Sequence, residues 1–464
     1  MPFSSLIFVG LFLPLSLLAL WLATRFSAKS HEPANYVLLL FSLVFALFAG
    51  LGGLLILLGT TLLGWLGGRW IEKSPQPRKA LCLTLALLIG ILAFFKYAGL
   101  TLSLPVTLGI SFYIFKIISY EADIYRKKIP AERNFLHFLL YVICFHHISQ
   151  GPILRYDSFK QDLLSRRITP DAVAAGIMRF SLGLAKKVIL ADQMGTLTNT
   201  VFPLSDGGSG IPTLGIWLGS LLFSLQMYLD FSAYTDMALG LGKMAGFTYP
   251  ENFDYPYCAP SVKQFWRRWH MSLSFFFRDY VYIPLGGNRK GKARTSLNLL
   301  IVWLLTGIWH GPTWNFLLWG LYYFLIISLE NLTERLPFRL PGLLRHIYVI
   351  FVFNLGWLLF RITDLKLLGK ALRGFFGFTS PAGFSSPLIT TLLWNNIFIL
   401  TAAVLACTPL WKALGKKAEA WAASREKAQG LLAAGRILLC AAALILSVII
   451  MAGSSYQPFL YNNF

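Results

Sequence analysis

Charged residues are scarce in this chain. Asp, Glu, Lys and Arg make up 13% of its 464 residues and hydrophobic residues make up 56%, whereas soluble domains carry about 25% charged residues. This scarcity excludes an ordinary soluble domain. A membrane-spanning helix needs roughly 20 mostly apolar residues, and runs of about that length recur along the sequence. The composition therefore predicts an all-α, polytopic integral membrane protein.

Acidic residues are the scarcer charged class, with 20 Asp and Glu against 41 Lys and Arg, so that the net charge is +21. A basic chain could bind nucleic acid, but Lys and Arg also gather in the cytoplasmic loops of membrane proteins. We favour the second interpretation and expect a lipid bilayer, and no nucleic acid, as a partner. Because the basic segment 412–436 should be cytoplasmic, the last helix should run outward. Residues 454–464 would then form an extracytoplasmic C-terminal tail.

Cysteines and repeats are also rare. The five Cys residues are scattered and show no CxxC or Cys/His spacing, so we expect free thiols and no metal site. The sequence contains no internal repeat, which disfavours an inverted-repeat transporter. It also lacks a low-complexity linker, which favours a single membrane domain over residues 1–464.

Apolar runs that could span a bilayer are distributed over the whole chain. They lie near residues 5–24, 35–50, 51–68, 80–98, 104–120, 135–153, 172–191, 212–229, 231–247, 345–360, 393–411 and 437–453. Together with an interrupted apolar stretch at 296–330, they predict about 11 to 13 transmembrane helices. Re-entrant helices and cytoplasmic interfacial helices are expected between them.

The densest polar segment lies at 251–294, within a predicted cytoplasmic-side interfacial segment at 245–295. Its aromatic residues alternate with cations, so it can lie at the membrane surface with its rings in lipid. The same cations could bind the phosphates of an anionic substrate. Both interpretations stay open, and the candidate donor-binding residues are Arg267, Arg268, Arg278 and Lys290.

The stretch 296–330 is interrupted in its middle by "TGIWHGP", in which Gly307, Gly311 and Pro312 break the helix. We expect a broken helical hairpin that enters from the cytoplasmic side. Broken backbone at membrane depth is tolerated only where protein buries it or where it lines a water-filled cavity. His310 at such a place is a candidate catalytic residue, because a neutral imidazole can take a proton from an attacking hydroxyl.

A second candidate is His270, which ends the sequence "WRRWH". The neighbouring cations should favour the neutral form of its imidazole. Sequence alone leaves its role open between a base, an orienting partner and a packing residue.

Four further polar positions could line a tunnel or act as structural anchors. Trp309 and Asn315 lie beside His310 in the sequence, and Asp230 and Asp236 lie in the apolar run "LDFSAYTDMALGLG". Intramembrane carboxylates are costly and usually paired. As ion ligands they would indicate a transporter, whereas as hydrogen-bond anchors they would be structural. We favour anchors.

Two segments together resemble a known family. "FWRRWHMSLSFFFRDYVYIPLGGNRKG" and "LLTGIWHGPTWNFLLWGLYY" are similar to the signature segments of the membrane-bound O-acyltransferases (MBOAT), in particular the bacterial branch that acylates alginate, peptidoglycan and, more distantly, teichoic acid. The resemblance implies an MBOAT fold with a central funnel, with His310 as the catalytic histidine of the "WHG" motif. It implies that His270 is the second histidine along the same tunnel.

The same resemblance implies the reaction and its partners. The donor would be cytoplasmic acetyl-CoA, with no permanently bound cofactor. The acceptor would be an extracytoplasmic polysaccharide, such as an alginate-like exopolysaccharide or peptidoglycan, reached through a serine-hydrolase-like (SGNH) acetyltransferase outside the bacterial inner membrane. The alternatives are D-alanyl transfer to teichoic acid, a transporter of an anionic or lipid-linked glycan, and a catalytically silent scaffold.

The chain ends on the aromatic tail "PFLYNNF". Tyr and Phe favour the headgroup region, so the tail could be an interfacial anchor. It also resembles a Phe-x-Tyr-x-x-Phe motif of related bacterial systems, which implies that Tyr461 carries the acyl group to the partner enzyme. We expect this acyl relay, since a phenol is easier to deprotonate than an alkyl alcohol.

Overall fold

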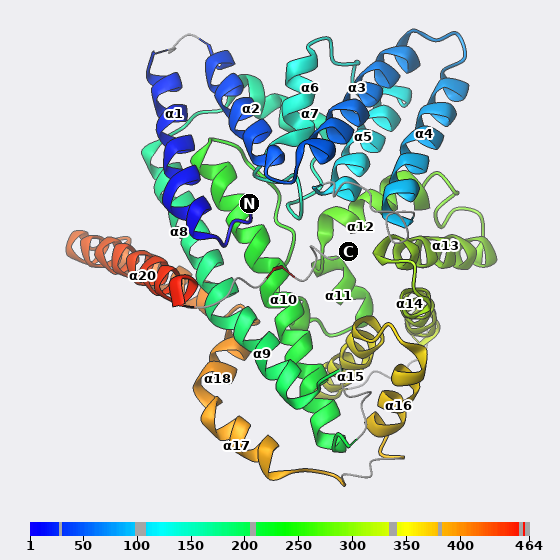
Figure 1. Ribbon diagram of the computed structural model, residues 1–464, viewed down its shortest axis with the longest axis vertical. Coiled ribbons are helices and arrows are strands. Elements are labelled where there is room, and N and C mark those ends of the chain that lie inside the picture. The colour runs from blue at the N-terminus through cyan, green and yellow to red at the C-terminus, as the bar shows by residue number, and fades with distance from the viewer. Residues whose placement is uncertain are drawn as a thin grey trace. The chain divides into compact units, whose positions relative to one another are not determined.

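The computed structural model describes residues 1–26, 30–97, 108–204, 210–333, 341–378, 383–453 and 458–459. Within these ranges every regular element is a helix, and Figure 1 shows their arrangement along the chain. The predicted all-α fold class is therefore confirmed.

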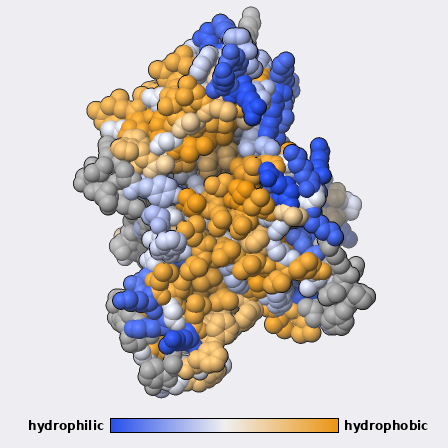
Figure 2. Space-filling view, turned by 90° about the vertical axis from the view of Figure 1, so that its right-hand side faces the viewer, coloured by the Kyte–Doolittle hydropathy of each residue, from blue (hydrophilic) through white to orange (hydrophobic). Residues whose placement is uncertain are grey.

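Seven helices are long and apolar enough to cross a membrane, or eight if the bent pair α17 (Pro387–Asn395) and α18 (Ile397–Ala406) forms one span. The seven are Phe8–Phe26, which includes α1 (Leu13–Phe26), and α3 (Leu51–Lys73), α4 (Pro77–Tyr97), α10 (Thr213–Met244), α14 (Trp314–Thr333), α15 (Gly342–Arg361) and α20 (Glu426–Gly453). Figure 2 shows hydrophobic residues over much of the drawn surface, with hydrophilic residues in separate clusters. Such a surface suits contact with lipid, and the predicted polytopic membrane protein is confirmed.

The described residues hold fewer such helices than the about 11 to 13 that the apolar runs predict. The predicted spans 212–229 and 231–247 were wrongly separated, because both belong to the continuous helix α10. Asp230 does not interrupt this helix. Its Oδ1 lies 2.8 Å from Nζ of Lys187, so the carboxylate is buried as part of an ion pair rather than as a lone charge.

The predicted span 135–153 is also wrong, because its helix α6 (Phe135–Ile143) is only 9 residues long. Lys116 of α5 (Ile110–Tyr125) contacts polar groups at the end of α6 and in the residues that follow α6. Its Nζ lies 2.6 Å from Nδ1 of His147 and 3.3 Å from the carbonyl oxygen of Val142. Since a side chain satisfies these groups, the backbone can leave the helix without unpaired carbonyls.

The remaining helices are shorter or more polar. They are α2 (Glu32–Leu47), α7 (Tyr156–Ser165), α8 (Pro170–Ala185), α9 (Asp192–Val201), α11 (Val262–Arg268), α12 (Met271–Phe277), α13 (Lys292–His310), α16 (Leu365–Phe375) and α19 (Leu410–Ala422). A π-helical turn at Lys186–Ala191 joins α8 to α9, and another at Arg278–Tyr282 follows α12.

The chain divides into two compact units. The first contains residues 1–184, 234–251 and 451–458, and the second contains residues 185–233, 252–450 and 459–464. The single-domain organisation of residues 1–464 stays a prediction.

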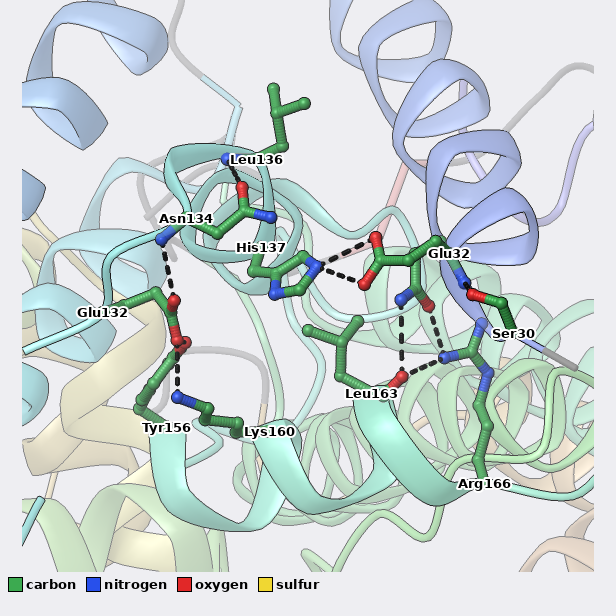
Figure 3. Close-up of polar contacts among 11 residues, drawn as sticks. Ser30, Glu32, Glu132, Asn134, Leu136, His137, Tyr156, Lys160, Leu163 and Arg166 are labelled. Carbon is green, nitrogen blue, oxygen red and sulfur yellow. Dashed lines mark hydrogen bonds and ion pairs between the residues drawn. The ribbon is translucent and has the colours of Figure 1, made fainter. Parts of the chain in front are cut away.

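A polar network joins the helices of the first unit (Figure 3). Glu32 at the start of α2 accepts a hydrogen bond from Nε2 of His137 on α6 at 2.8 Å. Glu132, which precedes α6, pairs with Nζ of Lys160 at 2.8 Å and accepts a hydrogen bond from the Tyr156 hydroxyl, both on α7. His137 thus has a carboxylate partner in the structure, and these contacts fix α2, α6 and α7 to one another.

In the second unit, α13 and α14 pack closely because a glycine of each helix faces the backbone of the other helix. A Cβ on Gly307 of α13 would lie 2.5 Å from the carbonyl oxygen of Phe316, and one on Gly320 of α14 would lie 2.4 Å from the carbonyl oxygen of Trp303. Small residues allow such close helix contacts inside membrane proteins. The two helices therefore form a tightly packed hairpin around the break that follows His310.

Gly320→Ala is expected to lower the midpoint of thermal unfolding, because its methyl group meets a backbone carbonyl that cannot rotate away. Overpacking of this kind costs about 1–3 kcal/mol. The matched control is Gly430→Ala on α20, where a Cβ meets nothing within 4 Å. Thermal unfolding in detergent, followed by size-exclusion chromatography, measures both variants. Equal midpoints would contradict the close packing of α13 against α14.

Candidate functional site

The break between α13 and α14 is held by Asn315. This residue is fully buried, and its Nδ2 donates hydrogen bonds to the carbonyl oxygens of Leu359 at 3.2 Å and Phe360 at 3.1 Å. Those carbonyls belong to the last turn of α15, where helical partners are absent. The Thr313 hydroxyl donates to Oδ1 of Asn315 at 2.5 Å. Asn315 therefore acts as a structural clamp that ties the break to α15.

His310 is the last residue of α13 and is buried among aromatic rings. Its imidazole lies 5.1 Å from the ring of Trp319 and 4.9 Å from that of Phe360, both nearly perpendicular to it. The ring of Trp309 lies 4.6 Å from the imidazole. Packing against these three rings limits the orientations of the imidazole.

His270 has an unusual backbone conformation at the start of α12. Its φ of 42° and ψ of 56° lie in the left-handed region, which residues other than glycine rarely adopt. Its Nδ1 lies 3.3 Å from Oδ1 of Asn252, which also accepts hydrogen bonds from the Ser272 backbone N–H at 3.0 Å and the Ser272 hydroxyl at 2.9 Å. Strained backbone of this kind clusters at functional sites.

The hydrogen bonds of Asn252 also fix the tautomer of His270. Since its Oδ1 accepts from a backbone N–H, the same oxygen must accept from Nδ1–H, which leaves the imidazole lone pair on Nε2. Burial lowers the pKa of His270 to about 3. The neutral form predicted from the sequence is therefore present at neutral pH, but its cause is burial rather than the neighbouring cations.

Both histidines line one pocket of about 240 Å³ in the second unit. We call it the two-histidine pocket. Its walls are mainly aromatic and aliphatic, and its lining residues are Trp266, Trp269, His270, Leu273, Ser274, Phe277, Arg278, Tyr282, Leu299, Val302, Trp303, Thr306, His310 and Trp319. A largely apolar pocket with a few convergent polar groups is the usual form of a small-molecule site.

One of the four candidate donor-binding cations lies on the two-histidine pocket. Arg278 lines it and pairs with Asp279, whose Oδ1 is 2.7 Å from Nε of Arg278. Arg267 and Lys290 are exposed and Arg268 is half-buried, and among the described residues these three are outside the pocket lining. The structure thus places only Arg278 beside the histidines.

Asp230 and Asp236 both form ion pairs with basic residues. Asp230 pairs with Lys187, and Oδ1 of Asp236 lies 2.9 Å from a guanidinium nitrogen of Arg179, which also binds Glu251. These contacts favour structural anchors over ion ligands. Trp309 packs on His310 without lining the two-histidine pocket, within the part of the chain that is described.

The sequence did not reveal Asn252 and Glu330, which position the site. Asn252 fixes His270 across 18 residues. Glu330, near the end of α14, accepts hydrogen bonds from the backbone N–H groups of Val262 at 2.7 Å and Lys263 at 3.0 Å, and so caps α11 across 68 residues. Glu330 is an acidic residue at the end of an apolar stretch, and this position could have marked it as a candidate. Its partners, Val262 and Lys263, could not be predicted from spacing along the chain.

Tyr461 lies outside the described residues. Of the tail, Pro458 and Phe459 are described, and Phe459 is fully buried. Over the described ranges, no group of three or more His, Cys, Asp or Glu side chains could hold a metal ion.

The comparisons with known proteins identify the family. Residues 91–368, which contain both pocket histidines, match the family described as MBOAT, membrane-bound O-acyltransferase. The chain belongs to this family. Over its whole length it is 34% identical to the probable alginate O-acetylase AlgI of Azotobacter vinelandii, all of which is covered. The protein is therefore a membrane acyltransferase, as the motifs predicted.

Two further relatives of this MBOAT protein have other acceptors in their names. The peptidoglycan O-acetyltransferase of Helicobacter pylori is 31% identical over 81% of this chain and 80% of the relative. The teichoic acid D-alanyltransferase of Bacillus subtilis is 32% identical over 49% of this chain and 60% of the relative. The similarity to the two relatives named as O-acetylating enzymes thus covers more of the chain than the similarity to the D-alanyltransferase.

The buried neutral form of His270 predicts a pH dependence of stability. In the unfolded chain its imidazole takes up a proton below about pH 6.5, whereas in the folded chain it stays neutral down to about 3. The folded state then binds fewer protons, so stability falls as the pH decreases from about 6.5 to about 3, by up to about 1.4 kcal/mol per pH unit.

His270→Gln is therefore expected to show a weaker loss of thermal stability on acidification than the unchanged protein. The unfolding midpoint in detergent, measured from about pH 7 to about pH 4, gives the two slopes. Identical slopes for the two proteins would exclude a linked proton at His270.

Proposed function

We propose that this acyltransferase takes an acetyl group from cytoplasmic acetyl-CoA and passes it across the bacterial inner membrane for O-acetylation of an extracytoplasmic polysaccharide. The observation that carries the proposal is the two-histidine pocket, in which His270 and His310 share one apolar cavity. The full-length similarity to a probable alginate O-acetylase and the similarity to a peptidoglycan O-acetyltransferase support an acetyl donor and a polysaccharide acceptor.

His310 would act as the general base. Its imidazole would accept the proton of an acceptor hydroxyl as the oxygen attacks the thioester carbonyl of acetyl-CoA. The C–O bond forms, the C–S bond breaks, and the proton passes from the imidazolium to the departing thiolate. A water-poor pocket with aromatic walls suits this reaction because it limits competing hydrolysis of the thioester.

His270 lines the same pocket and would assist the transfer. Its Nδ1–H is bound to Asn252, so Nε2 is the nitrogen that could accept a hydrogen bond from the donor or the acceptor. Fixing the ring through Nδ1 sets its orientation before any substrate enters.

Cations on the same segment would hold the donor. Arg278 lines the two-histidine pocket, and Arg267, Arg268 and Lys290 belong to the same polar segment, 251–294. Guanidinium groups bind phosphates bidentately, and a lysine ammonium binds them as a point charge. These residues would bind the phosphates of acetyl-CoA while the thioester enters the apolar pocket.

The acetyl group would leave through the C-terminal tail. Tyr461 would receive it from acetyl-CoA as an aryl ester and pass it to the serine of an extracytoplasmic SGNH acetyltransferase, which would acetylate a sugar hydroxyl. This route places the C-terminus on the extracytoplasmic face. The ion-paired state of Asp230 and Asp236 gives no support to a transporter that uses them as ion ligands.

His310→Ala is expected to abolish acetylation of the surface polysaccharide, because transfer from the thioester loses its base; general acid–base catalysis contributes about 10²–10⁴-fold. Acetyl content of the purified glycan and thiol release from acetyl-CoA are the two measurements. His346→Ala on α15 is the control and should acetylate normally. A membrane-inserted His310→Ala protein that still acetylates would overturn the proposed function, as would transfer of D-alanine in place of acetyl.

Tyr461→Phe removes only the hydroxyl that would carry the acetyl group. We expect loss of glycan acetylation with unchanged binding of acetyl-CoA, measured by titration of the purified protein with the donor. Tyr456→Phe, five residues earlier in the same tail, is the matched control and should be active. Normal acetylation by Tyr461→Phe would return the tail to the role of an aromatic anchor.

A further inference from the structure

A short helix connects two candidate membrane spans of the second unit. The bent pair α17–α18 ends at Ala406, and α20 begins at Glu426. Between them, α19 (Leu410–Ala422) is joined to its neighbours by residues 407–409 and 423–425. Because both connections are short, α19 is confined to the membrane surface at which these two spans end.

Large apolar side chains on α19 face away from the protein. Trp411, Leu414 and Trp421 are 60%, 45% and 56% exposed, and their spacing brings them to one side of a helix with about 3.6 residues per turn. The buried residue of this helix is the small Ala422. We call the three exposed residues the apolar stripe. Since Trp favours the boundary between lipid and water, the apolar stripe fits a lipid surface.

The segment 410–436 is also strongly basic. It contains two acidic residues, Glu419 and Glu426, against six basic ones, and Glu419 pairs with Arg436 of α20. The basic residues, all of them exposed, are Lys412, Lys416, Lys417, Arg425, Lys427 and Arg436. Clusters of about 4–8 cations beside a membrane span are typical of segments that bind anionic phospholipid. The charge therefore favours an anionic bilayer over a zwitterionic one.

The loop 252–271 carries part of the two-histidine pocket. Trp266, Trp269 and His270 of this loop line the pocket. Its two ends are joined, because the backbone N–H of Met271 donates to the carbonyl oxygen of Asn252 at 3.0 Å. In a closed loop, a contact at one position also restricts the conformations of the others.

Two contacts connect this loop to the start of α19. The thiol of Cys258 donates to the carbonyl oxygen of Cys407, just before α19, at 3.8 Å. Nζ of Lys412 on α19 lies 6.0 Å from the centre of the Tyr255 ring. A surface that fixes α19 would thus also support the loop that carries His270.

We propose that α19 binds an anionic phospholipid surface, with the apolar stripe in the lipid, and that this binding supports the loop 252–271. The long lysine side chains of α19 reach the lipid phosphates while its aromatic rings lie deeper. The bound partner is bilayer lipid rather than free phosphate, because the apolar stripe would have no role in binding a free ion.

Lipid binding is tested by quenching in nanodiscs that hold the full-length protein and an equal mixture of phosphatidylglycerol and phosphatidylcholine. A fluorescent amino acid replaces Leu414, and either one lipid or the other is brominated. Brominated phosphatidylglycerol should quench the probe more strongly than brominated phosphatidylcholine. A probe at Ala420, on the other side of α19, should be quenched weakly by both. Equal quenching at position 414 by the two lipids, or none by either, overturns the proposal.

The role of charge is tested by replacing Lys412, Lys416 and Lys417 with Gln in the protein that carries the probe. We expect the preference for phosphatidylglycerol to be lost, since each lysine near an anionic surface changes binding by about fivefold. The matched control replaces three exposed cations of α16 with Gln and should keep the preference; these cations are Lys366, Lys370 and Arg373. Equal unfolding midpoints in detergent would show that both triple variants fold. A preference that survives in the α19 variant contradicts the proposal.

Support of the loop is tested by thiol release from acetyl-CoA in the same nanodiscs, a measurement that rests on the proposed function. Phosphatidylglycerol should raise the rate about fivefold or more over phosphatidylcholine alone, and the α19 variant should lose this increase while the α16 variant keeps it. A rate that does not depend on phosphatidylglycerol would contradict the support of the loop. If no variant and not even the unchanged protein releases thiol, the proposed function fails, whereas the quenching still decides lipid binding.

Discussion

The candidate functional site depends on how helices can end inside the protein without leaving backbone groups unpaired. Where α13 ends at His310, Asn315 just beyond the break donates its amide N–H groups to two carbonyl oxygens at the end of the neighbouring helix α15. Gly307 and Gly320 then let α13 and α14 approach until backbone meets backbone. Because the break is clamped on both sides, His310 is held in the two-histidine pocket rather than on a mobile loop.

His270 is also positioned by a buried amide side chain. The amide oxygen of Asn252 accepts hydrogen bonds from the imidazole N–H, a backbone N–H and a hydroxyl group. These bonds stabilise the left-handed backbone conformation of His270, which would otherwise be unfavourable. Glu330 in turn caps α11, which precedes His270. Each catalytic candidate thus depends on a buried polar residue that does not line the pocket, within the described part of the chain.

The two aspartates of α10 are paired with basic residues. Lys187 lies between Asp192 and Asp230, and Arg179 joins Asp236 to Glu251. Removing one partner of a buried pair leaves an uncompensated charge, so the pairing with Lys187 makes it possible for α10 to carry Asp230 in its middle, where the sequence suggested a boundary. Nζ of the same lysine lies 4.6 Å from the ring centre of Phe459.

The sequence by itself determined the membrane class, the all-helical fold and the acyltransferase family, because hydropathy and long motifs are local properties. It also predicted a break within "TGIWHGP", which lies at Gly311 and Pro312, whereas the prediction that Gly307 breaks the helix was wrong because this glycine lies inside α13 and packs against α14. It could not show that 212–229 and 231–247 are one helix, since the partner of Asp230 is 43 residues away in the chain. Only the tertiary structure showed that Arg278 alone of the four cations lines the pocket, that Asn252 and Glu330 hold it, and that Phe459 contacts Lys187. Those facts depend on which surfaces meet after folding, and no periodicity or spacing along the chain encodes them.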